Sequence, residues 1–204
     1  MLQRENGLAV ALVDFDNIVP GVSDSIDIED GMRVITRTLR FVIAKHWAEV
    51  TELRTRMYGG WLRKSGLETR NATWIAPRLS DFRSTVNGLF IDPEIAYATL
   101  WNPRPIRGTF RFSSDREPDD PDRAHQKMVD SMIISDVINL AVLDVPVIIM
   151  TDDDDVVPGV MAYRDIAAAG AIMWLRRRPA GASCNDESLR RQGVVIETYA
   201  AGGV

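Results

Sequence analysis

The sequence predicts an α/β fold in which a mostly parallel sheet is covered by helices on both faces. Short apolar runs, which suit strands buried on both faces, alternate along the chain with longer segments of helical periodicity. Such alternation is typical of strand–helix–strand units, whose strands lie parallel in one sheet. The composition, 46% hydrophobic and 26% charged, is ordinary for a globular protein, and we expect one domain over residues 1–204.

The first half of the chain opens this alternation. Leu8–Phe15 (LAVALVDF) is an apolar run that predicts a buried strand. Apolar residues then recur at helical spacing, at Met32, Ile35, Leu39, Val42, Ile43 and Trp47. Glu52–Trp61 (ELRTRMYGGW) predicts a second strand, which we expect to stop at Gly59-Gly60. The segment at about 62–105 has a poor pattern and predicts an irregular helical insertion.

The second half of the chain repeats the alternation more clearly. The predicted elements are a strand at 106–113, a loop at 117–122, a helix at 126–142, a strand at 145–151, a helix at 156–169 and a strand at 171–175. From about residue 179 we expect a C-terminal tail, with a short helix or strand after Ser188.

Composition excludes several classes of protein. The net charge of −5 gives no overall basic field for nucleic acid, although local arginines can still steer an RNA strand. Cys184 is the only cysteine, and His46 and His125 lie far apart, so an internal disulfide and the usual zinc motifs are excluded. No apolar run approaches the roughly 20 residues that cross a bilayer. We therefore expect a cytoplasmic protein that does not act at a membrane.

Acidic residues follow two of the predicted strands. Asp14 and Asp16 come at the end of the first strand, and in an extended segment this spacing places both on one side. Asp153 and Asp155 have the same spacing after the strand at 145–151. Because the carboxyl ends of parallel strands meet at one edge of a sheet, we expect the two clusters to lie close together.

The helix that begins near Gln126 is the third source of carboxylates. It carries Asp130 near its start and Asp136 further along. Six residues apart, the two lie roughly 120° around the helix and about 9 Å along it, so both cannot serve one small site equally. We favour Asp130, which is nearer the strand ends. Oxygen ligands that converge without histidine or cysteine suit Mg²⁺ or Mn²⁺, whereas each aspartate alone is more typical of a turn or cap.

Three motifs resemble the NYN domains, a branch of the PIN-like metal-dependent ribonucleases that includes the bacterial LabA-like proteins. VDFDN (Val13–Asn17) resembles the family's D-x-[DE]-N at the end of its first strand. KMVDSMIISD (Lys127–Asp136) resembles its K-x-V-D with a second aspartate six residues later. IIMTDDDDVVP (Ile148–Pro158) resembles its S-G-D-x-D-F-x-P after the fourth strand.

This resemblance implies a three-layer α/β/α sandwich and Mg²⁺- or Mn²⁺-dependent hydrolysis of RNA, as an endoribonuclease. The metal ligands that it implies are Asp14, Asp130, Asp153 and Asp155. The supporting residues are Asn17, Thr151, Asp136 and Lys127, of which Asp136 ranks lower because of its helical phase. Lys127 could contact a phosphate or moderate the repulsion between carboxylates, or it could be an ordinary surface lysine. Asp152 and Asp154 are then expected to face outward.

Other residues suggest where the substrate, single-stranded or structured RNA, would lie. Arginines that could line a groove for the RNA backbone are Arg104, Arg107, Arg111, Arg123 and the run Arg176–Arg178. Tyr58 and Trp61 could stack on bases, but we expect them to pack in the core. The apolar segment Leu89–Trp101 suits either a core or the contact surface of a homo-oligomer.

Two other functions are open. VDFDNI also resembles the nucleophile motif of haloacid-dehalogenase phosphatases, with Asp14 attacking phosphorus and Asp16 as acid and base; the chain has no lysine after Lys127, which that family needs. The second alternative is a non-catalytic PIN-like module that binds RNA or protein, although such a module has no need of four ligands.

Overall fold

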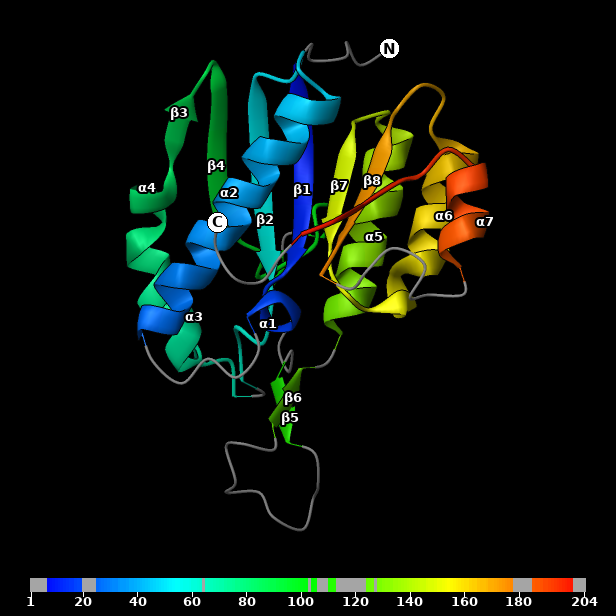
Figure 1. The fold of residues 1–204 in the computed structure, drawn as a ribbon. Coiled ribbons are helices and arrows are strands. Elements are labelled where there is room, and N and C mark those ends of the chain that lie inside the picture. Colours follow the sequence, from blue (N-terminus) through cyan, green and yellow to red (C-terminus); the bar gives the residue numbers. More distant parts are fainter. Residues whose placement is uncertain are drawn as a thin grey trace.

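The computed structural model describes residues 7–19, 25–63, 65–102, 104–105, 110–112, 124–126, 128–177 and 185–199. Its centre is a seven-stranded sheet with the order β3-β4-β2-β1-β7-β8-β9 (Figure 1). The strands are β1 (Leu8–Asp14), β2 (Glu52–Tyr58), β3 (Ser84–Val86), β4 (Leu89–Ile95), β7 (Val147–Met150), β8 (Ile172–Arg176) and β9 (Val195–Thr198). Every neighbouring pair is parallel except β3 and β4.

The order of the strands reverses between β1 and β7. From β1 the chain builds outward through β2 and β4 on one side, and from β7 through β8 and β9 on the other. The carboxyl ends of β1 and β7 therefore lie side by side at the point where ligands bind in open parallel sheets. Figure 1 shows this edge next to α1 (Phe15–Ile18).

Helices cover both faces of the sheet, which confirms the predicted three-layer α/β/α sandwich. The remaining helices are α2 (Ser25–His46), α3 (Arg70–Ile75), α4 (Leu79–Phe82), α5 (Val129–Val142), α6 (Val157–Ile166) and α7 (Asp186–Arg191), with short 3₁₀ helices η1 (Ala76–Arg78) and η3 (Asp154–Val156). One core lies between the sheet and α2 with α3, and a second between the sheet and α5, α6 and α7.

Strand β1 shows why the strand sequences are continuous apolar runs. Ala9, Ala11 and Val13 belong to the core under α2, whereas Val10 and Leu12 belong to the core under α5 and α6. Because neither face of β1 meets water, polar residues do not alternate with apolar ones along it. The first polar residue, Asp14, marks the end of the strand.

The segment at 62–105 differs from the irregular helical insertion that its sequence predicts. Its first half holds the short helices α3, η1 and α4, but its second half supplies β3 and β4 of the main sheet. Asn87 and Gly88, both with positive φ, form the tight turn between them, as Asn-Gly pairs do in hairpins. The strand β4 is hard to see in the sequence because it contains two charged residues, Asp92 and Glu94, and Pro93. The proline lies beyond the part of β4 that pairs with β3, so β4 has only one neighbouring strand, β2, at that position.

The C-terminal region also differs from the predicted tail. Residues 185–199 form α7 and then β9, which pairs in parallel with β8 at the edge of the sheet. Near the middle of the chain, Phe110–Phe112 (β5) pairs with Ala124–Gln126 (β6) in a separate ribbon, so the helix predicted from Gln126 begins at Val129. The predicted loop at 117–122 lies outside the described residues.

The described helices include none that is both apolar and long enough to cross a membrane. The longest, α2, has 22 residues but carries charges along its length.

The burial of α5 gives a first prediction, because this helix carries Asp130. Val137 is fully buried and Val142, on the same helix, is 67% exposed. We expect Val137→Ala to lower the free energy of unfolding by about 2 kcal/mol, from lost apolar burial and the cavity left behind. Val142→Ala should change it by less than about 0.5 kcal/mol. Urea unfolding measures both, and equal effects would contradict this packing.

Candidate metal centre

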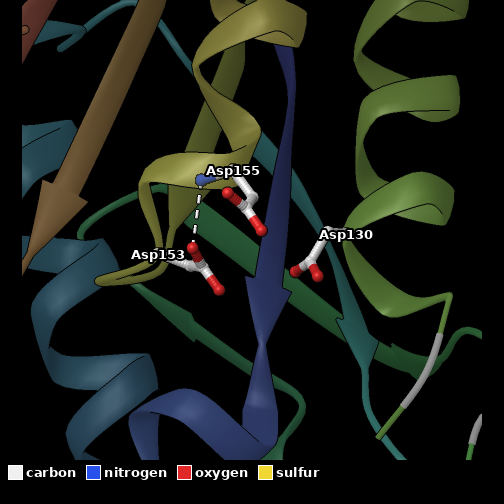
Figure 2. Close-up of side chains that lie close together, drawn as sticks. All are labelled: Asp130, Asp153 and Asp155. Carbon is white, nitrogen blue, oxygen red and sulfur yellow. Dashed lines mark hydrogen bonds between the residues drawn. The ribbon is translucent and has the colours of Figure 1, made fainter.

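Three carboxylates from two separate segments lie together at the carboxyl edge of the sheet. Asp130 is in the first turn of α5, and Asp153 and Asp155 belong to the turn after β7. Each offers an oxygen atom, and these atoms all lie within 4.8 Å of one another. Figure 2 shows the three side chains converging beside the end of β1. This is the edge where the sequence predicts that the acidic clusters meet.

The turn after β7 holds two of these aspartates through its own backbone. Asp153 caps the 3₁₀ helix η3, because its carboxylate accepts a hydrogen bond of 3.0 Å from the amide of Asp155. The amide of Asp153 donates in turn to the Thr151 hydroxyl over 3.1 Å. Such caps are the ordinary use of aspartate and threonine at helix starts. Here they also set the directions of Asp153 and Asp155.

Asp14 lies beside this group but not within it. It is fully buried at the end of β1, where its carboxylate caps α1 by accepting from the amide of Asn17 over 3.3 Å. Its second oxygen accepts from the Thr151 hydroxyl over 3.2 Å. That hydroxyl therefore joins Asp14 to the backbone of Asp153. The role of Asp14 as a direct ligand stays a prediction.

Asn17 makes a second connection between the two strand ends. Its side-chain oxygen accepts a hydrogen bond of 3.0 Å from the amide of Asp152. Asn17 and Thr151, two of the four predicted supporting residues, thus bind the backbone of the turn after β7. Neither belongs to the group of three clustered carboxylates. The motif VDFDN positions the turn that carries Asp153 and Asp155.

The expectation that Asp152 faces outward is wrong, whereas Asp154 stays partly exposed, with 39% of its side chain accessible, although it pairs with an arginine. Asp152 is only 4% exposed and accepts from the amide of Arg177 over 2.6 Å and from its guanidinium over 2.9 Å. Asp154 accepts from the guanidinium of Arg176 over 2.9 Å. The even-numbered aspartates therefore pair with arginines from the end of β8, and the odd-numbered ones turn toward Asp130.

Arg176 does not line an RNA groove as the sequence suggested, and Arg177, whose side chain is 30% exposed, pairs with Asp152. Arg176 is fully buried, packs over the Trp174 ring and pairs with Asp186 over 2.7 Å as well as with Asp154. The sequence did carry a signal for these ion pairs: a run of aspartates follows one strand and a run of arginines follows the next. Because β7 and β8 are parallel neighbours, these two runs of opposite charge lie side by side. Arg178, Arg107, Arg123 and Lys127 lie outside the described residues.

Asp136 is on α5 but outside the cluster, as its helical phase predicts. It is fully buried and accepts from the Tyr58 hydroxyl over 2.5 Å and from the amide of Leu100 over 2.7 Å. The guanidinium of Arg56 lies 3.4 Å away. Burial raises the pKa of Asp136, and these three donors oppose the rise. Its position indicates that it anchors the loop after β4.

Asp16 does not form an extended pair with Asp14, because α1 begins at Phe15. Its carboxylate instead accepts from the amide of Gly60 over 2.7 Å, just beyond β2, and burial raises its pKa. Tyr58 and Trp61 are buried, which confirms that they pack in the core, and the Trp61 ring lies 5.3 Å from that of Phe15.

Comparison of this chain with known protein families, with curated proteins and with solved structures finds no significant match. The resemblance to the NYN domains therefore rests on the three motifs, and the activity that it implies is a proposal.

The burial of Asp136 predicts its titration. The pKa of Asp136 in the folded protein lies above the ordinary value of 3.8, so the folded state binds the proton more tightly than the unfolded state does. The free energy of unfolding therefore falls, through this group, as pH rises from 3.8 through the folded-state pKa. Tyr58→Phe removes a donor that favours the carboxylate and should raise the midpoint further. Carboxyl-carbon NMR titration measures this. Tyr97→Phe, whose hydroxyl bonds Glu68, is the control and should leave the midpoint unchanged; a fall in Tyr58→Phe would contradict the assignment.

The pairing of Asp152 with Arg177 gives a further prediction, on stability. Arg177→Met leaves a buried carboxylate without its cation, and should lower the free energy of unfolding by about 3 kcal/mol. Arg191→Met breaks an exposed pair with Glu187 and should cost less than about 1 kcal/mol. Denaturant unfolding of the two variants compares them directly. Equal small losses would show that Asp152 is solvated.

Proposed function

We propose that this chain is a Mg²⁺- or Mn²⁺-dependent endoribonuclease. The observation that supports it best is the convergence of Asp130, Asp153 and Asp155 at the switch point of a parallel sheet. Catalysis on phosphodiesters commonly uses such clusters of carboxylates to hold a divalent cation. The choice of RNA as substrate comes from the three NYN-like motifs.

The three carboxylates fit a small divalent cation. In an octahedral shell with bonds of about 2.1 Å, adjacent oxygens are about 3 Å apart and opposite ones about 4.2 Å. The oxygens of the cluster, within 4.8 Å of one another, need only small side-chain rotations to reach this spacing. Carboxylate oxygens without histidine or cysteine favour Mg²⁺ or Mn²⁺ over zinc.

Electrostatics also favours a cation at this point. Two unit charges 4.8 Å apart repel by roughly 1 kcal/mol in water and by about 3–4 kcal/mol at an effective dielectric of 20. Arg176 and Arg177 engage Asp152 and Asp154 and not the clustered carboxylates. A divalent ion would remove the remaining repulsion, which is why its binding should stabilise the fold.

Each residue has a defined part in this proposal. Asp130, Asp153 and Asp155 hold the ion, which when bound supplies an activated water and stabilises the charge that develops on phosphate. Thr151 and Asp14 orient the backbone of Asp153 through the hydrogen bonds that join them. Such supporting contacts fix the direction of ligands and are costly to lose.

The geometry makes the phosphatase alternative less favourable. A nucleophilic Asp14 would need a carboxylate oxygen that reaches the substrate, but Asp14 is fully buried and both of its oxygens accept hydrogen bonds. A non-catalytic module that binds RNA or protein is the remaining alternative, and only an activity assay separates it from the ribonuclease.

The direct test is cleavage of labelled single-stranded and structured RNA with Mg²⁺ or Mn²⁺. Asp153→Asn and Asp130→Asn should each lower the rate by more than roughly a hundredfold, because they remove proposed ligands. Thr151→Val should lower it by about ten- to a hundredfold, as loss of a supporting contact does. Asp165→Asn, an exposed aspartate on α6, is the matched control and should retain full activity.

The same assay separates the alternatives. Equal cleavage by wild type and by Asp153→Asn and Asp130→Asn would contradict the site. Hydrolysis of a small phosphomonoester that is lost in Asp14→Asn would favour the phosphatase. RNA binding without cleavage in either metal would favour the non-catalytic module.

Metal binding itself is measurable without any substrate. A ligand at 100 times its Kd stabilises the native state by about 2.7 kcal/mol, so saturating Mn²⁺ should raise the Tm of the wild type by several degrees. Asp155→Asn should respond less, because one carboxylate of the cluster is gone. Asp165→Asn should respond like the wild type. No metal-dependent shift in the wild type would contradict the proposed centre.

A further inference from the structure

The loop after β4 exposes a large aromatic side chain. Trp101 is 80% exposed and its neighbour Leu100 is 40% exposed. Tryptophan is highly buried on average, because its ring is among the largest apolar surfaces that a side chain can remove from water. An exposed tryptophan ring gives up that stabilisation. Phe90, which is 37% exposed, lies on β4 itself, near the end of the strand away from this loop.

Hydrogen bonds hold this loop in one conformation. The guanidinium of Arg56 donates to the carbonyl of Ala98 over 2.7 Å, and the amide of Leu100 donates to Asp136 over 2.7 Å. Further along, the amide of Asn102 donates to the Thr99 hydroxyl over 3.1 Å. Trp101 therefore lies between two anchored residues and is exposed by an ordered loop.

The loop lies on the edge of the sheet that carries the metal centre. β4 is parallel to β2, and β2 to β1, so the residues after β4 emerge at the carboxyl edge with Asp14. Leu100 is bonded to Asp136, which follows Asp130 by six residues, about 9 Å along α5. Trp101 follows directly after this anchored residue, at the same edge of the sheet as the clustered carboxylates.

The charges beside Trp101 point to the kind of partner. Arg104 is exposed, and within the described ranges its guanidinium makes no ion pair, whereas Arg54 and Arg56 on the adjacent strand pair with Glu52 and Glu94. Arg104 follows Trp101 by three residues, and its amide donates to the Asn102 side chain over 3.2 Å, which keeps its backbone close to that of Trp101. An exposed aromatic ring and an arginine without an ion pair on one short loop suit single-stranded nucleic acid, which is bound by stacking and by phosphate contact. One tryptophan and one leucine are far less than the roughly 800 Å² per partner of a stable protein interface.

The geometry points to Trp101 as a stacking platform for an unpaired base of a single-stranded RNA substrate, with Arg104 at a neighbouring phosphate. This inference rests on the proposed ribonuclease function and names its substrate class. A base inside a duplex has both faces covered by its neighbours, so double-stranded RNA gains from this contact only at its two ends. Asp136 serves the same purpose indirectly, as the positioning residue that anchors the loop.

The test measures binding apart from cleavage. Proteins carrying Asp153→Asn are mixed with a fluorescent oligouridine, and affinity is read by fluorescence anisotropy with Mg²⁺ present. Trp101→Ala should weaken binding by about five- to a hundredfold, the effect of losing one stacked base, while Trp101→Phe should retain most of it. Phe41→Ala is the matched control, because Phe41 is a 64% exposed aromatic on α2, which covers the opposite face.

The outcomes separate this inference from the proposed function. Affinity for an RNA duplex whose two ends are closed by hairpin loops away from the helix, measured against the same loops alone, should change little in Trp101→Ala. Unchanged oligouridine affinity in Trp101→Ala would overturn the inference even if the wild type cleaves RNA. If the wild type does not cleave RNA but Trp101→Ala still weakens oligouridine binding, the proposed ribonuclease activity is contradicted and Trp101 remains a site of base stacking. A fall in molar mass of Trp101→Ala in light scattering, with RNA affinity kept, would assign Trp101 to a contact between copies.

Discussion

The candidate site depends on one connection, between the carboxyl ends of β1 and β7. The Thr151 hydroxyl donates to Asp14 and accepts from the amide of Asp153, and Asn17 accepts from the amide of Asp152. Because the strand order reverses at this point, no other strand lies between the two ends. These three hydrogen bonds hold the turn after β7 against the end of β1, and this places Asp153 and Asp155 opposite Asp130.

Four consecutive aspartates can be folded together because their charges are divided between two environments. Asp152 and Asp154 pair with Arg177 and Arg176, which end the neighbouring strand β8. The Asp152 carboxylate is buried, and its burial would be costly without Arg177, whereas Asp154 stays partly exposed beside Arg176. Asp153 and Asp155 instead lie with Asp130 in a group of carboxylates that could hold a metal ion.

Helix α5 connects the candidate metal centre to the loop that exposes Trp101. Asp130, in its first turn, faces Asp153 and Asp155, whereas Asp136 is buried on another side and bonded to Tyr58 and Leu100. Two carboxylates six residues apart thus have different surroundings. Asp130 is partly buried and belongs to the group that could hold a metal ion, whereas Asp136 has a raised pKa and a fixed set of donors. Movement of α5 would disturb both the centre and the loop.

The sequence by itself determined the α/β class, most strands and helices and the edge where Asp130, Asp153 and Asp155 meet, because apolar periodicity and strand-end position are local properties. Only the tertiary structure decided that β4 and β9 belong to the sheet, since the charges and proline of β4 hide its period. It also decided the directions of Asp152 and Asp154 and the burial of Asp14. Those depend on which strand ends lie side by side, and strand order is a non-local property that no single segment encodes.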